Sequence, residues 1–119
     1  MKYALLFYSP PHTEIPEGAR EATIGNMLEA MGRWIGDLEQ AGVFRSTLRL
    51  APVEAARSVR REAGEVLVTD GPFAETKEIL GGLLILECDS LEDALGWARR
   101  CPLNGIGTVE LRPEWPPGT

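Results

Sequence analysis

The pattern of apolar residues along the chain predicts strands and helices in alternation. Residues 2–8 (KYALLFY) are apolar on both alternating faces, which is typical of a strand covered on both sides. Between residues 17 and 41 the apolar period changes to three or four, which predicts a long helix that stops at Gly42. Its apolar stripe comprises Ile24, Leu28, Met31, Ile35 and Leu38, widened by Met27 and Trp34. Close approach of another element is predicted at the three internal glycines, Gly25, Gly32 and Gly36.

Two further segments favour strands. Residues 43–52 alternate strictly, which predicts a strand with one solvated or interface face. Residues 56–68 are expected to form two short strands joined by a turn at Ala63-Gly64. In the strand at 43–52, one face is expected to carry the side chains of Phe44, Ser46, Leu48 and Leu50.

The last third of the chain predicts a strand, a helix and a final strand. Residues 80–88 (LGGLLILEC) form a buried strand, and the S-L-E-D stretch from Ser90 resembles a capping box that begins a helix. This helix ends by Cys101, because Pro102 disfavours a helical residue before it. Residues 109–113 predict the final strand. The helix is expected to bury Leu91, Ala94, Leu95 and Ala98.

This order of elements predicts an α+β fold of the ferredoxin-like, split βαβ type, with an antiparallel sheet and both helices on one face. Residues 1–113 are expected to form one domain, followed by a C-terminal tail at 114–119. Strands at 3–8 and 83–88 are apolar on both sides, so the second face of the sheet needs a cover. We expect a symmetric homodimer with sheets packed face to face.

The composition of the chain argues against some classes of binding partner and some locations. The formal charge of −6 argues against a nucleic-acid partner, which requires a concentrated basic face. The sequence has no apolar run long enough to span a membrane, and its N-terminus lacks a secretory signal pattern. A cytoplasmic protein is therefore expected, with Cys88 and Cys101 as buried or half-buried free thiols.

Several stretches resemble the DGPF-type members of the YCII-related family. They are DGPFAETKE at 70–78, the glycine pair in LGGLLILE, SLEDALGWA at 90–98 and the terminal VELRP, and the opening KYALLFYSP and LEQAGVF at 38–44 fit the same pattern. The resemblance implies a dimeric α+β barrel fold. Its superfamily includes muconolactone isomerases and chlorite dismutase-like proteins, whereas the activity of the family itself is largely unassigned. DGPF proteins are often encoded beside sigma factors of the extracytoplasmic-function group, which implies a functional link to such a factor.

The YCII branch of the family is proposed to use a His–Asp pair, with the histidine on the first helix about eleven residues before its terminal Ala-Gly. Counting back from Gly42 reaches Met31, and no histidine lies on this helix. His12 is the only histidine, and it lies in a proline-rich loop. The pair is not reproduced in that form unless His12 folds over to Asp70.

Asp70 is the candidate catalytic residue, because it stands where a predicted strand leaves the sheet. Half burial there would raise its pKa and make it a usable general acid or base. The alternative is that its carboxylate only caps the turn and accepts from Phe73 or beyond, because Pro72 has no N–H. Phe73 is expected to pack into the core or the dimer interface.

The remaining candidates are ligand-binding residues: Tyr3 and Tyr8 to orient a substrate, Lys77 with neighbouring Glu75 to hold an ionic group, and the loop residue His12. The alternative for the charged pair is an ordinary solvated surface. Neither cofactor nor metal is expected, since one histidine and scattered carboxylates form no ligand spacing. Two functions fit: a small cofactor-free isomerase or lyase with acid–base chemistry at Asp70, or a non-catalytic small-molecule-binding or accessory module linked to transcriptional regulation.

Overall fold

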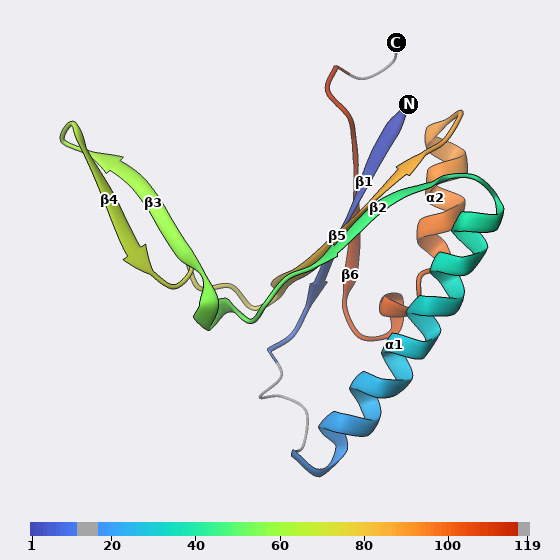
Figure 1. Cartoon of the computed structure of the whole chain (residues 1–119), viewed down its shortest axis with the longest axis horizontal. Helices are drawn as coiled ribbons and strands as arrows, with labels where there is room; N and C mark the ends of the chain where they lie inside the picture. The colour runs from blue at the N-terminus through green and yellow to red at the C-terminus, as the bar shows by residue number, and fades with distance from the viewer. Residues whose placement is uncertain (12–16, 117–119) are drawn as a thin grey trace.

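The computed structural model describes residues 1–11 and 17–116 (Figure 1). The 3-10 turns η2 (Val53–Ala55) and η3 (Pro102–Gly105) join some of the longer elements. In chain order these longer elements are β1 (Lys2–Ser9), α1 (Glu17–Gln40), β2 (Phe44–Arg49), β3 (Arg57–Glu62), β4 (Glu65–Asp70), β5 (Ile79–Glu87), α2 (Leu91–Arg99) and β6 (Thr108–Pro113).

Four of the strands form one antiparallel sheet with the order β2-β5-β1-β6. Both helices lie on the same side of this sheet (Figure 1). The α+β, ferredoxin-like prediction is therefore confirmed. Strands β3 and β4 pair only with each other, around the turn at Ala63 and Gly64 as predicted, and both turn residues have positive φ. This hairpin stands apart from the main sheet (Figure 1).

The core lies between the sheet and the two helices. Trp34 of α1 lies in the middle of this core. The centroid of its ring is 6.2 Å from that of Phe7 in an edge-on arrangement, and its indole N–H donates to the carbonyl of Trp97 at 3.1 Å. The hydrogen bond satisfies the only polar atom of a ring that is otherwise buried. Other members of the buried cluster are Tyr3, Leu5, Leu38, Leu84, Leu86, Cys88, Ala94, Ala98 and Cys101.

Helix α2 begins and ends as the sequence predicts. The Ser90 hydroxyl accepts a hydrogen bond from the Asp93 N–H at 3.1 Å, and the helix ends at Arg99. Ala94 and Ala98 face the core as expected. The prediction was wrong for Leu91, which remains 44% exposed because it occupies the first turn, at the end of the helix.

Strand β2 departs from strict alternation. Phe44 pairs with Leu86, but Ser46 pairs with Ile85 and Leu48 with Leu83, so the register shifts between Phe44 and Ser46. This irregularity sends Phe44 to the core side and Leu48 to the opposite side. The expectation that both share one face was therefore wrong.

The side of the sheet away from the helices is mainly apolar on β1, β2 and β5 and polar along the edge strand β6, and no described residue covers it. Leu48 is 56% exposed there. Alternation and register assign to this outer face Ala4, Leu6, Tyr8, Ser46, Leu48, Leu83 and Ile85, together with Thr108, Glu110 and Arg112 of β6.

The glycines of α1 do not mark a close approach within the chain. A Cβ at Gly25, Gly32 or Gly36 would meet nothing within 4 Å among the described residues, so that prediction was wrong. Close approach occurs instead at Gly107, where a Cβ would collide with the carbonyl oxygen of Tyr8.

Gly107→Ala should therefore lower the free energy of unfolding by about 1–3 kcal/mol, because the backbone must move to admit one methyl group. Gly105→Ala is the matched control, since a Cβ there meets nothing within 4 Å. Urea unfolding of both variants at equal protein concentration measures the difference. Equal stability of the two variants would contradict this packing.

Candidate functional site

The DGPF stretch closes the base of the β3–β4 hairpin. The Gly71 N–H donates to the Ala56 carbonyl at 2.8 Å, and the Ser58 hydroxyl donates to the Gly71 carbonyl at 2.8 Å. Gly71 has φ +87°, a conformation that favours glycine. Asp70 is part of the same closure, because its carboxylate lies 3.1 Å from the guanidinium of Arg57.

The Asp70 side chain is 90% exposed within the chain. Its environment is thus water and one arginine, and the half-buried position expected from the sequence is not present in a single chain. Phe73 is 81% exposed, so the expectation of core packing was wrong. Its packing in a dimer interface stays a prediction.

The other predicted ligand-binding residues do not share one site. Tyr3 lies in the core, whereas Tyr8 belongs to the outer face of the same strand. Glu75 and Lys77 are exposed in the connection between β4 and β5. His12 lies outside the described residues.

A polar cluster does form around Tyr8. Its phenol donates to the Glu110 carboxylate at 3.3 Å, and the Thr108 hydroxyl donates to that of Glu78 at 3.3 Å. Arg112 lies 3.9 Å from Glu110. We call Tyr8, Glu78, Thr108 and Glu110 the polar end of the outer face.

Burial raises the pKa of the Tyr8 phenol, and the negative charge and hydrogen bond of Glu110 raise it further. The phenol is consequently a proton donor, not a base, near neutral pH. The carboxylates of Glu78 and Glu110, which lie nearby, can accept hydrogen bonds or protons. Glu110 was not among the residues predicted from the sequence, although the period-2 pattern of Thr108, Glu110 and Arg112 places all three on one strand face.

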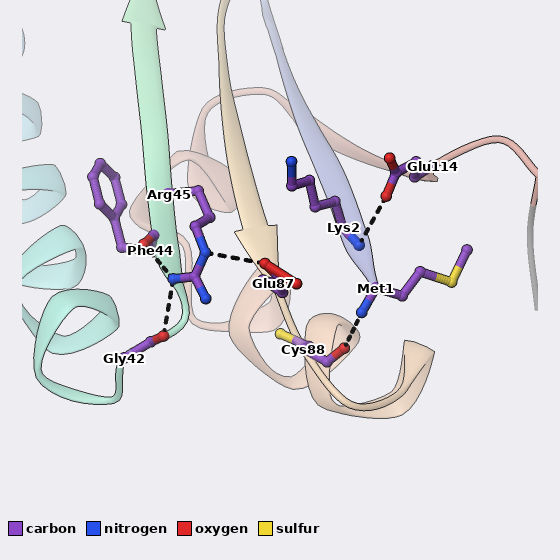
Figure 2. A network of polar contacts seen from close by, with 8 residues as sticks. All are labelled: Met1, Lys2, Gly42, Phe44, Arg45, Glu87, Cys88 and Glu114. Carbon is purple, nitrogen blue, oxygen red and sulfur yellow. Dashed lines mark hydrogen bonds and ion pairs between the residues drawn. The ribbon is translucent and has the colours of Figure 1, made fainter. Parts of the chain in front are cut away.

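A hollow lies at the other end of the sheet, next to the C-terminus of α1 and the face of α2. It is open and measures about 720 Å³, and its lining includes Val43, Arg45, Cys88 and Trp97. Figure 2 shows the polar contacts on its rim. The Arg45 guanidinium meets Glu87 at 3.1 Å and donates to the carbonyls of Gly42 and Phe44.

These contacts, with those of Met1 and Arg100, indicate that the residues around the hollow hold the structure together. The α-amino group of Met1 donates to the Cys88 carbonyl at 3.2 Å, as Figure 2 shows. Arg100 stacks on the Trp97 ring at 4.7 Å and meets Asp37 at 2.6 Å, which joins the two helices. The polar end of the outer face borders the uncovered apolar side of the sheet, whereas none of the apolar residues of that side lines this hollow, so the polar end is the better candidate site.

Both cysteines are free and buried, as predicted. Burial raises the pKa of the Cys88 and Cys101 thiols, which favours the unreactive protonated form. Within residues 1–11 and 17–116, no three histidine, cysteine or acidic side chains gather closely enough to hold a metal ion. In the same part of the chain, no helix is both long and apolar enough to cross a membrane.

An antiparallel sheet of order β2-β5-β1-β6 with both helices on one face (Figure 1) defines an α+β chain of the ferredoxin-like type. The model of the YCII-related domain matches residues 1–116, and the chain belongs to the YCII-related family.

Two individual proteins are also similar to this chain. An uncharacterised protein of Rhizobium meliloti (strain 1021) is 45% identical over 76 residues, which cover 62% of this chain and 61% of that protein. The match thus spans less than two thirds of the relative's length. The 5-chloro-2-hydroxyhydroquinone dehydrochlorinase TftG of Burkholderia phenoliruptrix AC1100, solved with 2,5-dihydroxybenzoquinone, superposes with a TM-score of 0.53 at 13% identity. That match covers 96% of this chain and 93% of TftG, and it shows a shared fold.

Glu110→Gln should lower the pKa of Tyr8, because it removes the charge that opposes phenolate formation. The pKa of Tyr8 should nevertheless stay above its usual value, since burial remains the largest cause. A raised pKa stabilises the fold below pH 10, and that contribution is lost as pH rises through the folded-state pKa. NMR titration of the Tyr8 ring carbon measures the change. An unchanged pKa in the variant would contradict the contact.

Proposed function

We propose that this YCII-related protein is a homodimer that binds a small organic molecule at the polar end of the outer face. One observation supports the proposal above all: the face opposite the helices is apolar over its centre and ends in the Tyr8–Glu110 hydrogen bond. An apolar surface of this kind on a small chain marks an interaction site.

A second copy is the natural cover for this face. A two-fold axis brings the same patch of two copies together, so an apolar face complements itself. Each leucine or isoleucine removed from water contributes about 1.5–3 kcal/mol when burial is complete. Leu6, Leu83 and Ile85 are half-buried in the single chain, and Leu48 is 56% exposed, so each has further surface to bury.

The ligand chemistry follows from the side chains at the polar end. The Tyr8 O–H already donates to Glu110, so its oxygen can accept a hydrogen bond from a ligand, Glu78 and Glu110 supply further acceptors, and the neighbouring outer face is apolar. These groups suit a flat apolar body that carries hydroxyl or amino groups. TftG, which shares the fold, was solved with a dihydroxybenzoquinone, a molecule of that kind.

The second candidate is an acid–base enzyme of the isomerase or lyase kind, and the dehydrochlorinase name of TftG favours it by analogy of fold. Asp70 would be its acid or base in our proposal. Because the Asp70 carboxylate is 90% exposed beside Arg57, such a role requires a second copy to exclude water from it.

Leu48→Asp should abolish the dimer, because it places a charge on the outer face. Leu28→Asp is the matched control: Leu28 is 48% exposed on α1, against 56% for Leu48, but faces away from the proposed interface. Light scattering of both variants at equal concentration gives their masses. If both stay dimeric, the outer face is not the interface.

Hydroxylated aromatic compounds should raise the melting temperature of the wild type, since a ligand at one hundred times its Kd stabilises by about 2.7 kcal/mol. Tyr8→Phe and Glu110→Gln should each remove most of that shift. Asp70→Asn should keep the shift if the protein only binds. Were the compound converted by the wild type and not by Asp70→Asn, the enzyme candidate would hold instead. A shift that survives in both polar-end variants would place the site elsewhere.

A further inference from the structure

The β3–β4 hairpin, residues 57–70, which we call the arm, has no packing partner within its own chain. Every arm residue except Ser58 is exposed. Its valines have large exposed fractions for apolar side chains: Val59 is 65%, Val66 55% and Val68 64% exposed. A two-stranded hairpin alone is only marginally stable in water, so an arm of this composition needs another surface.

The two faces of the arm differ in character. Cross-strand pairs put Val59 opposite Val68, and Arg61 opposite Val66, on one face, which we call the valine face. The other face pairs Arg60 with Leu67 and otherwise bears only polar or charged side chains, Ser58, Thr69, Glu62 and Glu65. The valine face is therefore the one that gains more by burial.

The position of the arm indicates what covers it. Its root joins the sheet beside the outer face, where the Leu50 N–H donates to the Gly81 carbonyl at 2.9 Å. From there it extends to the side of the sheet away from the helices (Figure 1). The outer face and the arm thus border the same space, and a second copy packed on the outer face would lie in it.

We propose that the arm of each copy packs its valine face against the second copy of this chain. This inference rests on the homodimer of the proposed function and adds a second, separate contact to it. The occupant is a second copy because the arm continues from the outer face, which is itself self-complementary.

The distribution of charge in the chain also favours a second copy as the partner of the arm. The arm holds three arginines and three acidic residues, so the whole net charge of −6 lies outside it. On the valine face Arg57 is paired with Asp70, whereas the recorded partner of the Arg61 guanidinium is a backbone carbonyl, that of Gly64. Arg61 therefore brings a positive charge to a body that is acidic.

The arrangement gives the DGPF stretch a role in assembly. The Asp70–Arg57 ion pair and the two hydrogen bonds of Gly71 close the root of the arm and set its direction. Phe73, 81% exposed at the same root, would be covered when the second copy is present. The site of each copy would then be bordered by residues of its partner.

Two substitutions at neighbouring positions of β4 distinguish the contributions of the two faces of the arm to the dimer. Val68→Asp puts a charge on the valine face, and Leu67→Asp makes a similar change on the opposite face of the same strand. Sedimentation velocity should show at least a tenfold rise in the dimer dissociation constant for Val68→Asp and less than a twofold change for Leu67→Asp. Hydrogen exchange of β4 amides in the wild type should slow as protein concentration passes the dissociation constant.

Each other result has a distinct meaning. A wild type that is monomeric at all concentrations overturns the homodimer and the arm contact together. A dimer that tolerates both substitutions, with β4 amides that exchange at the monomer rate, overturns only the arm contact. Protection that arises only in species larger than a dimer would assign the arm to contacts between dimers, and the proposal would be wrong.

Discussion

The structure depends on one imbalance: its sheet is apolar on both faces, and the chain has helices for only one of them. Trp34 and Leu38 from α1, with Ala94 and Ala98 from α2, cover the inner face and complete the core. Leu6, Leu83 and Ile85 on the outer face receive no such cover from the described chain. Burial of apolar surface is the dominant favourable contribution to folding and association, so we propose that the uncovered face forms the contact with a second copy.

The candidate site follows from the same imbalance. Polar side chains on β1 and β6 gather where the outer face ends, and there Tyr8 donates to Glu110. A hydrogen bond on a surface that becomes enclosed gains strength, because less water competes for its partners. The arm adds a second surface that requires a partner, with the DGPF stretch at its root. In this proposal the site and the arm both border the uncovered face of the sheet.

Most of the fold could be predicted from local patterns. Apolar periodicity gave the strands and helices, Ser90 gave the start of α2, and Ala63-Gly64 gave the hairpin turn. The exceptions have physical reasons. The register shift of β2 depends on pairing with β5, which local alternation does not encode.

The site was harder to predict, because it depends on how distant segments meet. Asp70 ends a strand, as the sequence indicates, but that strand belongs to an arm outside the main sheet, and its carboxylate stays exposed. Glu110 was not selected because its importance comes from Tyr8, more than a hundred residues earlier in the chain. Tyr8 was selected, and only the pairing of β1 with β6 shows which partner it has.

The central claim is that a second copy covers the outer face, and solvent accessibility of its methyl groups tests this directly. Leucine and isoleucine methyls would be labelled, and a soluble paramagnetic agent would broaden those in contact with water. We predict that Leu6, Leu83 and Ile85 remain sharp at high protein concentration, while Leu28, 48% exposed on α1, broadens. Equal broadening of the outer-face methyls and Leu28 would contradict the account.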